Sequence, residues 1–166
     1  MKMSDGVEWG IHCASVLSQI DAGATLPGKA LAEFHGVSES YLLKHLKALT
    51  AAGIFESVPG PHGGYRLARA AAEITLLDIV LAVDGSEPAF RCSEIRQRGP
   101  AALPAKFYRT PCGINKAMLR AERAWRAELK AVTVADMVKD YACSAETRSQ
   151  ELAKAWAEQN QRRSAS

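Results

Sequence analysis

The stretch from residue 26 to residue 67 constrains the fold most, because its hydrophobic period changes from helical to strand-like within one short segment. It opens with an apolar helix that is expected to break at His35-Gly36. Ser38 follows, where its hydroxyl can cap a second helix by accepting from first-turn N–H groups. That helix has one apolar side, and three other side chains are expected on another side: Lys44, His45 and Lys47. Gly53 is expected to end it.

A glycine-tipped hairpin is expected next. Residues 54–58 alternate like a strand, and residues 65–67 look like its return strand. The residues between them, Pro59-Gly60-Pro61-His62-Gly63-Gly64, tolerate the unusual dihedral angles of a tight turn. Helix, turn, helix and hairpin together predict a winged helix-turn-helix, whose second helix fits the major groove of DNA. The expected fold class is therefore mainly α with a small β wing.

The predicted DNA contacts lie on the second helix and the wing. Four residues of the first helical turns can reach base edges or phosphates: Ser38, Ser40, Tyr41 and Lys44. His62 and Arg66 are placed on the wing for the minor groove or the backbone. A core position for Tyr41 is an equally good interpretation. The net charge of +3 permits an acidic partner without requiring one, so the DNA prediction depends on pattern more than on charge.

The chain is expected to have four parts. Residues 1–85 form the DNA-binding domain, with a first helix over 4–20 and a later one over 76–83. Residues 86–112 form a basic, Pro-containing loop that is too long for an ordinary connection and is expected to be functional. Residues 113–140 hold a long helix with one apolar stripe, suited to a dimer seam, and a short helix capped by Thr133. Residues 141–166 form a polar tail, expected to be partly disordered, including Arg162-Arg163.

Two cysteines bracket the loop. Cys112 comes immediately before a helix, where free N–H groups and the helix dipole favour the metal-binding thiolate over the thiol. Cys92 lies at the other end, and the simplest alternative is that neither cysteine has a role. No apolar run approaches the roughly 18 residues of a membrane span and no signal peptide is visible, so a cytoplasmic location is expected.

Two phrases, GGYRLAR and ITLLDIVLAVDG, closely resemble the Rrf2 family of winged-helix regulators, which includes IscR, NsrR and RsrR. The resemblance runs from about residue 1 to residue 138. Three further phrases, SDGVEW, FRCSEIRQRGP and AERAWRAEL, look most like the RsrR redox-sensing branch. The resemblance implies a homodimer held by the long helix and a 2Fe–2S cluster bound at the loop.

The resemblance also implies a ligand set. The three-cysteine pattern of IscR is excluded, because Arg98 and Pro104 occupy the interval where its other cysteines would lie. Like the RsrR branch, this chain would complete the ligation with Glu8 and His35 from the other subunit. The remaining candidates are His12, Cys13, Glu94 and Cys143. Local roles are the alternative for both proposed ligands: a turn hydrogen bond for the histidine and a first-turn acid for the glutamate.

The sequence therefore predicts a homodimeric transcription regulator, a repressor, that binds double-stranded operator DNA and senses redox state through a 2Fe–2S cluster. The oxidised, cluster-loaded form is expected to bind DNA best. One alternative is a cluster-free regulator with a thiol–disulfide switch between Cys92 and Cys112; another is control by a protein partner. No nucleophile–base set, phosphate loop or HExxH motif is present, so neither an enzyme nor a small-molecule substrate is expected.

Overall fold

The computed structural model describes residues 3–163. Its elements, in chain order, are α1 (Asp5–Leu17), α2 (Gly28–His35), α3 (Glu39–Ala51), β1 (Phe55–Val58), β2 (Gly64–Leu67), the 3-10 turn η1 (Ala71–Glu73), α4 (Leu76–Asp84), the 3-10 turns η2 (Ile95–Gln97) and η3 (Ala105–Tyr108), α5 (Gly113–Ala131), α6 (Val134–Ser144) and α7 (Thr147–Asn160). The mainly helical fold with a two-stranded wing is the predicted one. Helix α1 is shorter than the predicted span of 4–20.

The tight turn between α2 and α3 depends on Gly36, which has a φ of 64° in the left-handed region that a side chain disfavours. The next residue, Val37, packs against the core and its N–H donates to Ala32 O at 3.0 Å. Ser38 occupies the N-cap position of α3, as predicted, but its hydroxyl makes no capping bond. The hydroxyl lies 3.1 Å from that of Ser40 instead, so the capping prediction was right in position and wrong in contact.

The wing is an antiparallel pair in which Phe55 faces Leu67 and Val58 faces Gly64. A third extended segment joins it, because Leu26 exchanges backbone hydrogen bonds of 2.9 and 2.8 Å with Tyr65. A Cβ atom on Gly64 would lie 2.5 Å from Leu26 O, so this close approach requires glycine.

One hydrophobic core joins the wing to α1, α2, α3 and α4, and its largest fully buried side chains are Leu26, Leu31, Leu42, Leu46, Leu49, Ile54, Phe55, Ile74 and Ile79. Two capping boxes fix the helices that follow. Thr75 Oγ1 accepts from Asp78 N at 3.1 Å at the start of α4. Thr133 Oγ1 accepts from Asp136 N at 3.2 Å at the start of α6, as predicted for that cap.

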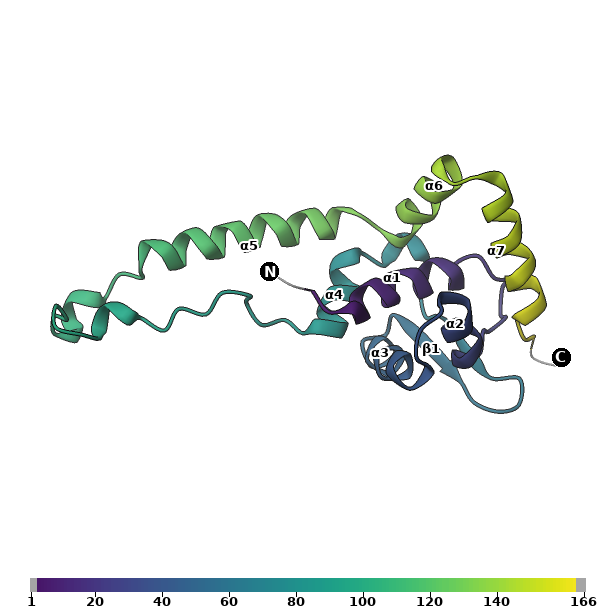
Figure 1. The fold of residues 1–166 in the computed structure, drawn as a ribbon, viewed down its shortest axis with the longest axis horizontal. Helices are drawn as coiled ribbons and strands as arrows, with labels where there is room; N and C mark the ends of the chain where they lie inside the picture. Colours follow the sequence, from purple (N-terminus) through teal and green to yellow (C-terminus); the bar gives the residue numbers. More distant parts are fainter. Residues whose placement is uncertain (1–2, 164–166) are drawn as a thin grey trace.

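Helix α5 and the loop before it project away from this core (Figure 1). No residue of α5 is buried, and its apolar stripe begins with Ile114 and Met118, which are 66% and 43% exposed. Glu122 and Arg126 form the expected i,i+4 ion pair, with 2.7 Å between Oε1 and Nη2. The outer part of the apolar stripe therefore has no partner within the described part of the chain, whereas Trp125 and Leu129, nearer the core, are partly buried.

The C-terminal segment differs from the predicted tail. Helix α7 packs against α2, where the rings of Trp156 and Phe34 have centroids 4.3 Å apart. Beyond it, Arg162 exchanges backbone hydrogen bonds of 2.9 and 2.8 Å with Thr25. The last part of the predicted tail, residues 164–166, lies outside the described residues. Among residues 3–163, no helix is long and apolar enough to cross a membrane.

Candidate DNA interface and candidate metal ligands

The outer face of α3 carries the predicted DNA contacts. Leu42, Leu46 and Leu49 seat the helix in the core. The opposite side is left to solvent, and all four predicted contact residues of this helix are exposed: Ser38, Ser40, Tyr41 and Lys44. The Tyr41 residue is 62% exposed, which excludes the core position that the sequence left open.

His45 is the exception on α3, because it is buried beneath α1 and does not lie on the outer face with the two lysines. Its ring packs edge-on against Trp9, with centroids 5.8 Å apart. Gly6 makes this contact possible, since a Cβ atom there would lie 2.3 Å from His45 Cε1. The helical period contains the signal for this burial: His45 lies three residues after Leu42 and four before Leu49.

The wing side chains are arranged less simply than the sequence indicated. His62 is exposed, and its carbonyl accepts from Thr25 Oγ1 at 3.1 Å. Arg66 donates through Nε and Nη2 to both carboxylate oxygens of Glu56, at 2.8 and 2.9 Å. This pair lowers the pKa of Glu56 and raises the pKa of Arg66, in both cases mainly through the side-chain hydrogen bond. The Arg66 guanidinium is therefore engaged by its cross-strand neighbour.

His35 ends α2, directly before the turn into α3. Its Nε2 atom is buried and has no hydrogen-bond partner within the described residues. Burial, and then the nearby His12 imidazole, lower the pKa of His35 to about 4. The side chain is therefore a neutral imidazole with an unpaired nitrogen at pH 7, which is the state in which histidine binds metals.

Glu8 lies on the same side of α1 as His12, because the two residues are one helical turn apart. The rings of His12 and His35 have centroids 5.6 Å apart, so Glu8 lies one turn from the contact of α1 with His35. Glu8 is exposed and available to a ligand from outside the chain. The structure thus places the two predicted non-cysteine donors on one region of the winged-helix domain.

The two loop cysteines lie in the projecting part. Cys112 is the N-cap residue of α5 and is half-buried, and Cys92 is exposed. The loop folds over Arg96, whose guanidinium lies 5.2 Å from the centre of the Tyr108 ring. The pKa of Arg96 is raised, mainly by its hydrogen bond to Glu94 and with a smaller contribution from Cys112, so a cation lies near this sulfur.

The remaining cysteines and the loop acid fit less well as ligands. Cys13 is buried, and its burial raises the pKa of the thiol to about 12, so it does not form a thiolate near neutral pH. Cys143 lies exposed on α6, and Glu94 is engaged by Arg96. Within residues 3–163 of one chain, no three His, Cys, Asp or Glu residues come close enough together to hold a metal ion.

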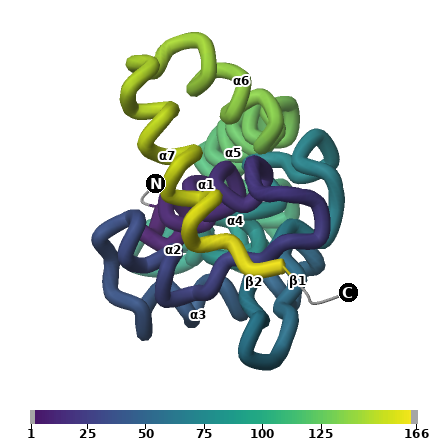
Figure 2. The backbone as a smooth tube through the Cα atoms, turned by 90° about the vertical axis from the view of Figure 1, so that its right-hand side faces the viewer, coloured from purple at the N-terminus to yellow at the C-terminus, as the bar shows by residue number. Residues whose placement is uncertain are grey.

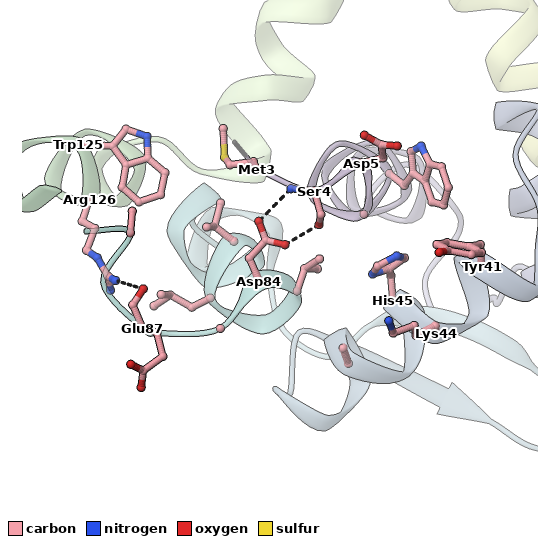
Figure 3. A pocket seen from close by; sticks show the side chains of 18 of the residues that line it. Met3, Ser4, Asp5, Tyr41, Lys44, His45, Asp84, Glu87, Trp125 and Arg126 are labelled. Atoms are coloured by element: carbon pink, nitrogen blue, oxygen red, sulfur yellow. Dashed lines mark hydrogen bonds between the residues drawn. The ribbon is translucent and has the colours of Figure 1, made fainter. Parts of the chain in front are cut away.

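A cavity of about 740 Å³ opens between α1, α3, α4 and α5. No motif or period in the sequence predicts it. Tyr41 and His45 line one side, and Trp125 and Arg126 line the other (Figure 3). Trp9 also lines the cavity, with its ring edge-on to that of His45. At its floor the Ser4 backbone N–H donates to Asp84 Oδ2 at 3.1 Å, which joins the start of α1 to the end of α4. The cavity lies where the DNA-reading helix approaches the long helix.

An exposed α3 face, a wing and a projecting amphipathic helix define a DNA-binding regulator of the winged helix-turn-helix class. The sequence model of the Rrf2 family, described as an iron-dependent transcriptional regulator, matches residues 3–140. The chain belongs to this family and is a transcription regulator that binds DNA, not an enzyme.

Two relatives show how far the similarity extends. Protein aau3 of Rhizobium meliloti (strain 1021) is 39% identical over 109 residues, which cover 66% of this chain and 67% of that protein. Protein rrf2 of Nitratidesulfovibrio vulgaris is 33% identical over 140 residues, which cover 84% of this chain and 89% of that protein.

Two solved structures share the fold. CymR (YrzC), described as the global cysteine regulator of B. subtilis, superposes with a TM-score of 0.63 at 24% identity, covering 84% of this chain and 97% of that chain. T. potens IscR superposes with a TM-score of 0.63 at 25% identity, covering 90% of this chain and 96% of that chain.

Proposed function

We propose that this chain is a homodimeric repressor of the RsrR kind, which acts in the cytoplasm and whose affinity for operator DNA depends on a 2Fe–2S cluster. Cys92 and Cys112 of one protomer, with Glu8 and His35 of the other, would hold each cluster. The observation that carries the proposal is the orphaned Nε2 atom of His35. A buried polar atom without a partner costs about 1–3 kcal/mol, and a metal ligand bond would remove that cost.

The spacing of the donors favours a site shared between two chains. Helix α5 has 19 residues and is therefore about 28 Å long, with Cys112 at its far end. Its near end is held to the core, where Val132 O accepts from Leu76 N at 2.9 Å. Cys112 of one chain is consequently remote from the winged-helix domain of that chain. A 2Fe–2S cluster takes four protein ligands, so a second copy would supply the other two.

The unpartnered stripe of α5 supports the same arrangement. Exposed apolar side chains continue from Ile114 and Met118 into the loop, where Ile95, Leu103 and Phe107 are also exposed. A second copy packed along α5 would bury these side chains, and such burial contributes about 25 cal/mol per Å². Dimerisation and cluster binding would then depend on the same projecting segment.

His35 is placed to connect ligand binding with DNA reading. It is the last residue of α2, and Gly36 and Val37 are the only residues between it and the N-cap of α3. When bound, a 2Fe–2S cluster supplies a one-electron redox centre. A displacement of His35 would move the start of α3. Because two half-sites lie about one DNA turn apart, small shifts would spoil simultaneous docking.

The test is the iron content and visible spectrum of anaerobically purified protein. We expect about two irons per protomer, loss of the chromophore in Cys92→Ser and a changed spectrum in His35→Ala. Cys143→Ser, which alters an exposed cysteine on α6, is the control and should match the wild type. A colourless, iron-free wild type that still binds DNA would refute the proposal. Oxidant-dependent DNA binding that is lost in Cys112→Ser would then support the thiol–disulfide alternative.

A further inference from the structure

The C-terminal arm, defined here as residues 147–163, lies outside the residues 3–140 that match the family. It nevertheless packs on the DNA-binding domain. Trp156 stacks on Phe34 of α2, and Ala157 is only 7% exposed. After α7 ends, Gln161 Nε2 donates to Asp21 Oδ2 at 2.8 Å, and Gln161 Oε1 accepts from Asp21 N at 3.0 Å. These contacts direct the end of the arm toward the wing.

The end of the arm extends the wing sheet. Arg162 pairs through its backbone with Thr25, and the next residue, Leu26, pairs with Tyr65 of β2. Two single-residue bridges therefore place the arm beside residues 25–26, which in turn lie beside β2. Figure 2 shows the end of the chain reaching the wing strands, although these segments are far apart in sequence.

The Arg162 side chain reaches the wing turn itself. Its Nη1 atom donates to Pro61 O at 2.8 Å and to Gly63 O at 3.4 Å. Arg162 is exposed, and among the described residues only its Nη1 atom has an acceptor, which leaves Nε and Nη2 without one. A guanidinium has five N–H donors in a planar fork, so donors remain for a phosphate while Nη1 holds the turn.

The wing otherwise offers little positive charge. Its two strands carry Glu56 and Arg66, which neutralise each other across the pair. The turn between the strands has no lysine or arginine. Arg163 is itself paired with Asp21. Arg162 is therefore the cation that the fold brings to the wing turn, and the arm is what brings it there.

We propose that the C-terminal arm is part of the DNA-binding surface and that Arg162 binds a phosphate of duplex DNA beside the wing turn. The proposal rests on the DNA-binding role of the winged helix but not on the cluster. A phosphate contact carries no sequence information, so its loss weakens binding to all duplexes alike. Each neutralised phosphate contributes about 0.9 to the slope of log K against log salt, so one lost contact lowers the slope by about 1.

The experiment measures the affinity of the full-length protein for a random-sequence DNA duplex over a range of salt concentrations. We expect Arg162→Ala to bind roughly fivefold more weakly at low salt and to lower the slope by about 2 for the dimer, which is about 1 for each of its two Arg162 side chains. Lys154→Ala is the matched control, because it removes one positive charge from an exposed position on α7. It should leave both the affinity and the slope unchanged.

Arg162→Lys distinguishes phosphate binding from a purely structural role, because lysine keeps the positive charge but lacks the planar guanidinium that holds the wing turn. We expect this variant to recover the wild-type salt slope, since lysine also binds phosphate as a point charge. If Arg162→Lys instead shows a slope as low as that of Arg162→Ala, the proposal is overturned. Arg162 would then serve only to hold the wing turn in place. A wild-type slope and affinity in Arg162→Ala would overturn it as well. Iron content should be the same in all variants, so failure here leaves the cluster proposal untouched.

Discussion

The rings of His12 in α1 and His35 at the end of α2 lie with their centroids 5.6 Å apart and their planes at 48°. Two imidazoles at this separation oppose simultaneous protonation, and the partial burial of His35 opposes it further. Together these effects lower the pKa of His35 to about 4, with burial as the larger cause. The start of the DNA-reading element is therefore held against α1 by a ring that stays neutral.

The stability of the metal-free protein should consequently fall as the pH is lowered. Unfolded His35 gains a proton near pH 6.5, whereas folded His35 resists protonation until about pH 4. The contribution of His35 to the free energy of unfolding is thus fully present above pH 6.5 and is lost as the pH falls from 6.5 to 4. Urea unfolding at several pH values should show wild type losing roughly 1–2 kcal/mol more than His35→Gln over this window. His62→Gln, on the exposed wing, should lose as much stability as wild type. If the free energy of unfolding falls equally with pH in wild type, His35→Gln and His62→Gln, His35 is not the cause.

Gly6→Ala should disturb the contact between α1 and α3. The new Cβ atom would lie 2.3 Å from His45 Cε1, so the ring or the helix must move. We expect a loss of about 1–3 kcal/mol in the free energy of unfolding and weaker operator binding. Gly113→Ala is the control, because a Cβ atom there meets nothing within 4 Å. Unchanged stability in Gly6→Ala would show that the packing of His45 is looser than the structure indicates.

Glu56→Gln should strengthen DNA binding, because it releases Arg66 from its bidentate carboxylate. We expect roughly two- to fivefold tighter binding at low salt and a steeper salt dependence. Stability should change little, since the pair is exposed. Glu158→Gln removes one negative charge from α7, away from the wing, and should have no comparable effect. An equal gain in both variants would mean that net charge alone is responsible.

Met118→Glu should break the dimer by placing a charge on the exposed stripe of α5, where Met118 is 43% exposed. Analytical ultracentrifugation should find a monomer that holds no cluster, because in the proposed arrangement each chain would supply only part of the ligand set. Arg123→Glu, at an exposed position off the stripe, also changes charge and should stay dimeric. If the Met118→Glu protein remains a dimer, the dimer interface does not lie along this stripe of α5.

The winged helix was readable from the sequence because its signals are local. Helical periods, a left-handed Gly36 and a Gly-rich turn each act within a few residues. The capping residue Thr133 was predicted for the same reason. The contacts of the C-terminal arm could not be predicted, because its composition is polar and its partners are distant in sequence: the pairing of Thr25 with Arg162 leaves no periodic signal.

The site was predictable in part. The resemblance named His35, but its burial and orphaned nitrogen follow from how α2 packs against α1, which no motif encodes. The DNA contact of Arg66 stays a prediction based on residue type and wing position, whereas its pairing with Glu56 depends on strand register, which the sequence does not encode locally. The predicted position of His45 beside the two lysines is wrong, because its place in the helical period puts it on the buried side despite its polarity.

Operator affinity before and after removal of iron tests the account most directly. One batch of anaerobically purified protein is divided, half is stripped with a chelator, and both halves are titrated with operator DNA at the same salt concentration. The account predicts at least tenfold weaker binding by the stripped protein, a difference of about 1.4 kcal/mol. Dissociation constants that agree within about twofold, which is about 0.4 kcal/mol, would contradict it.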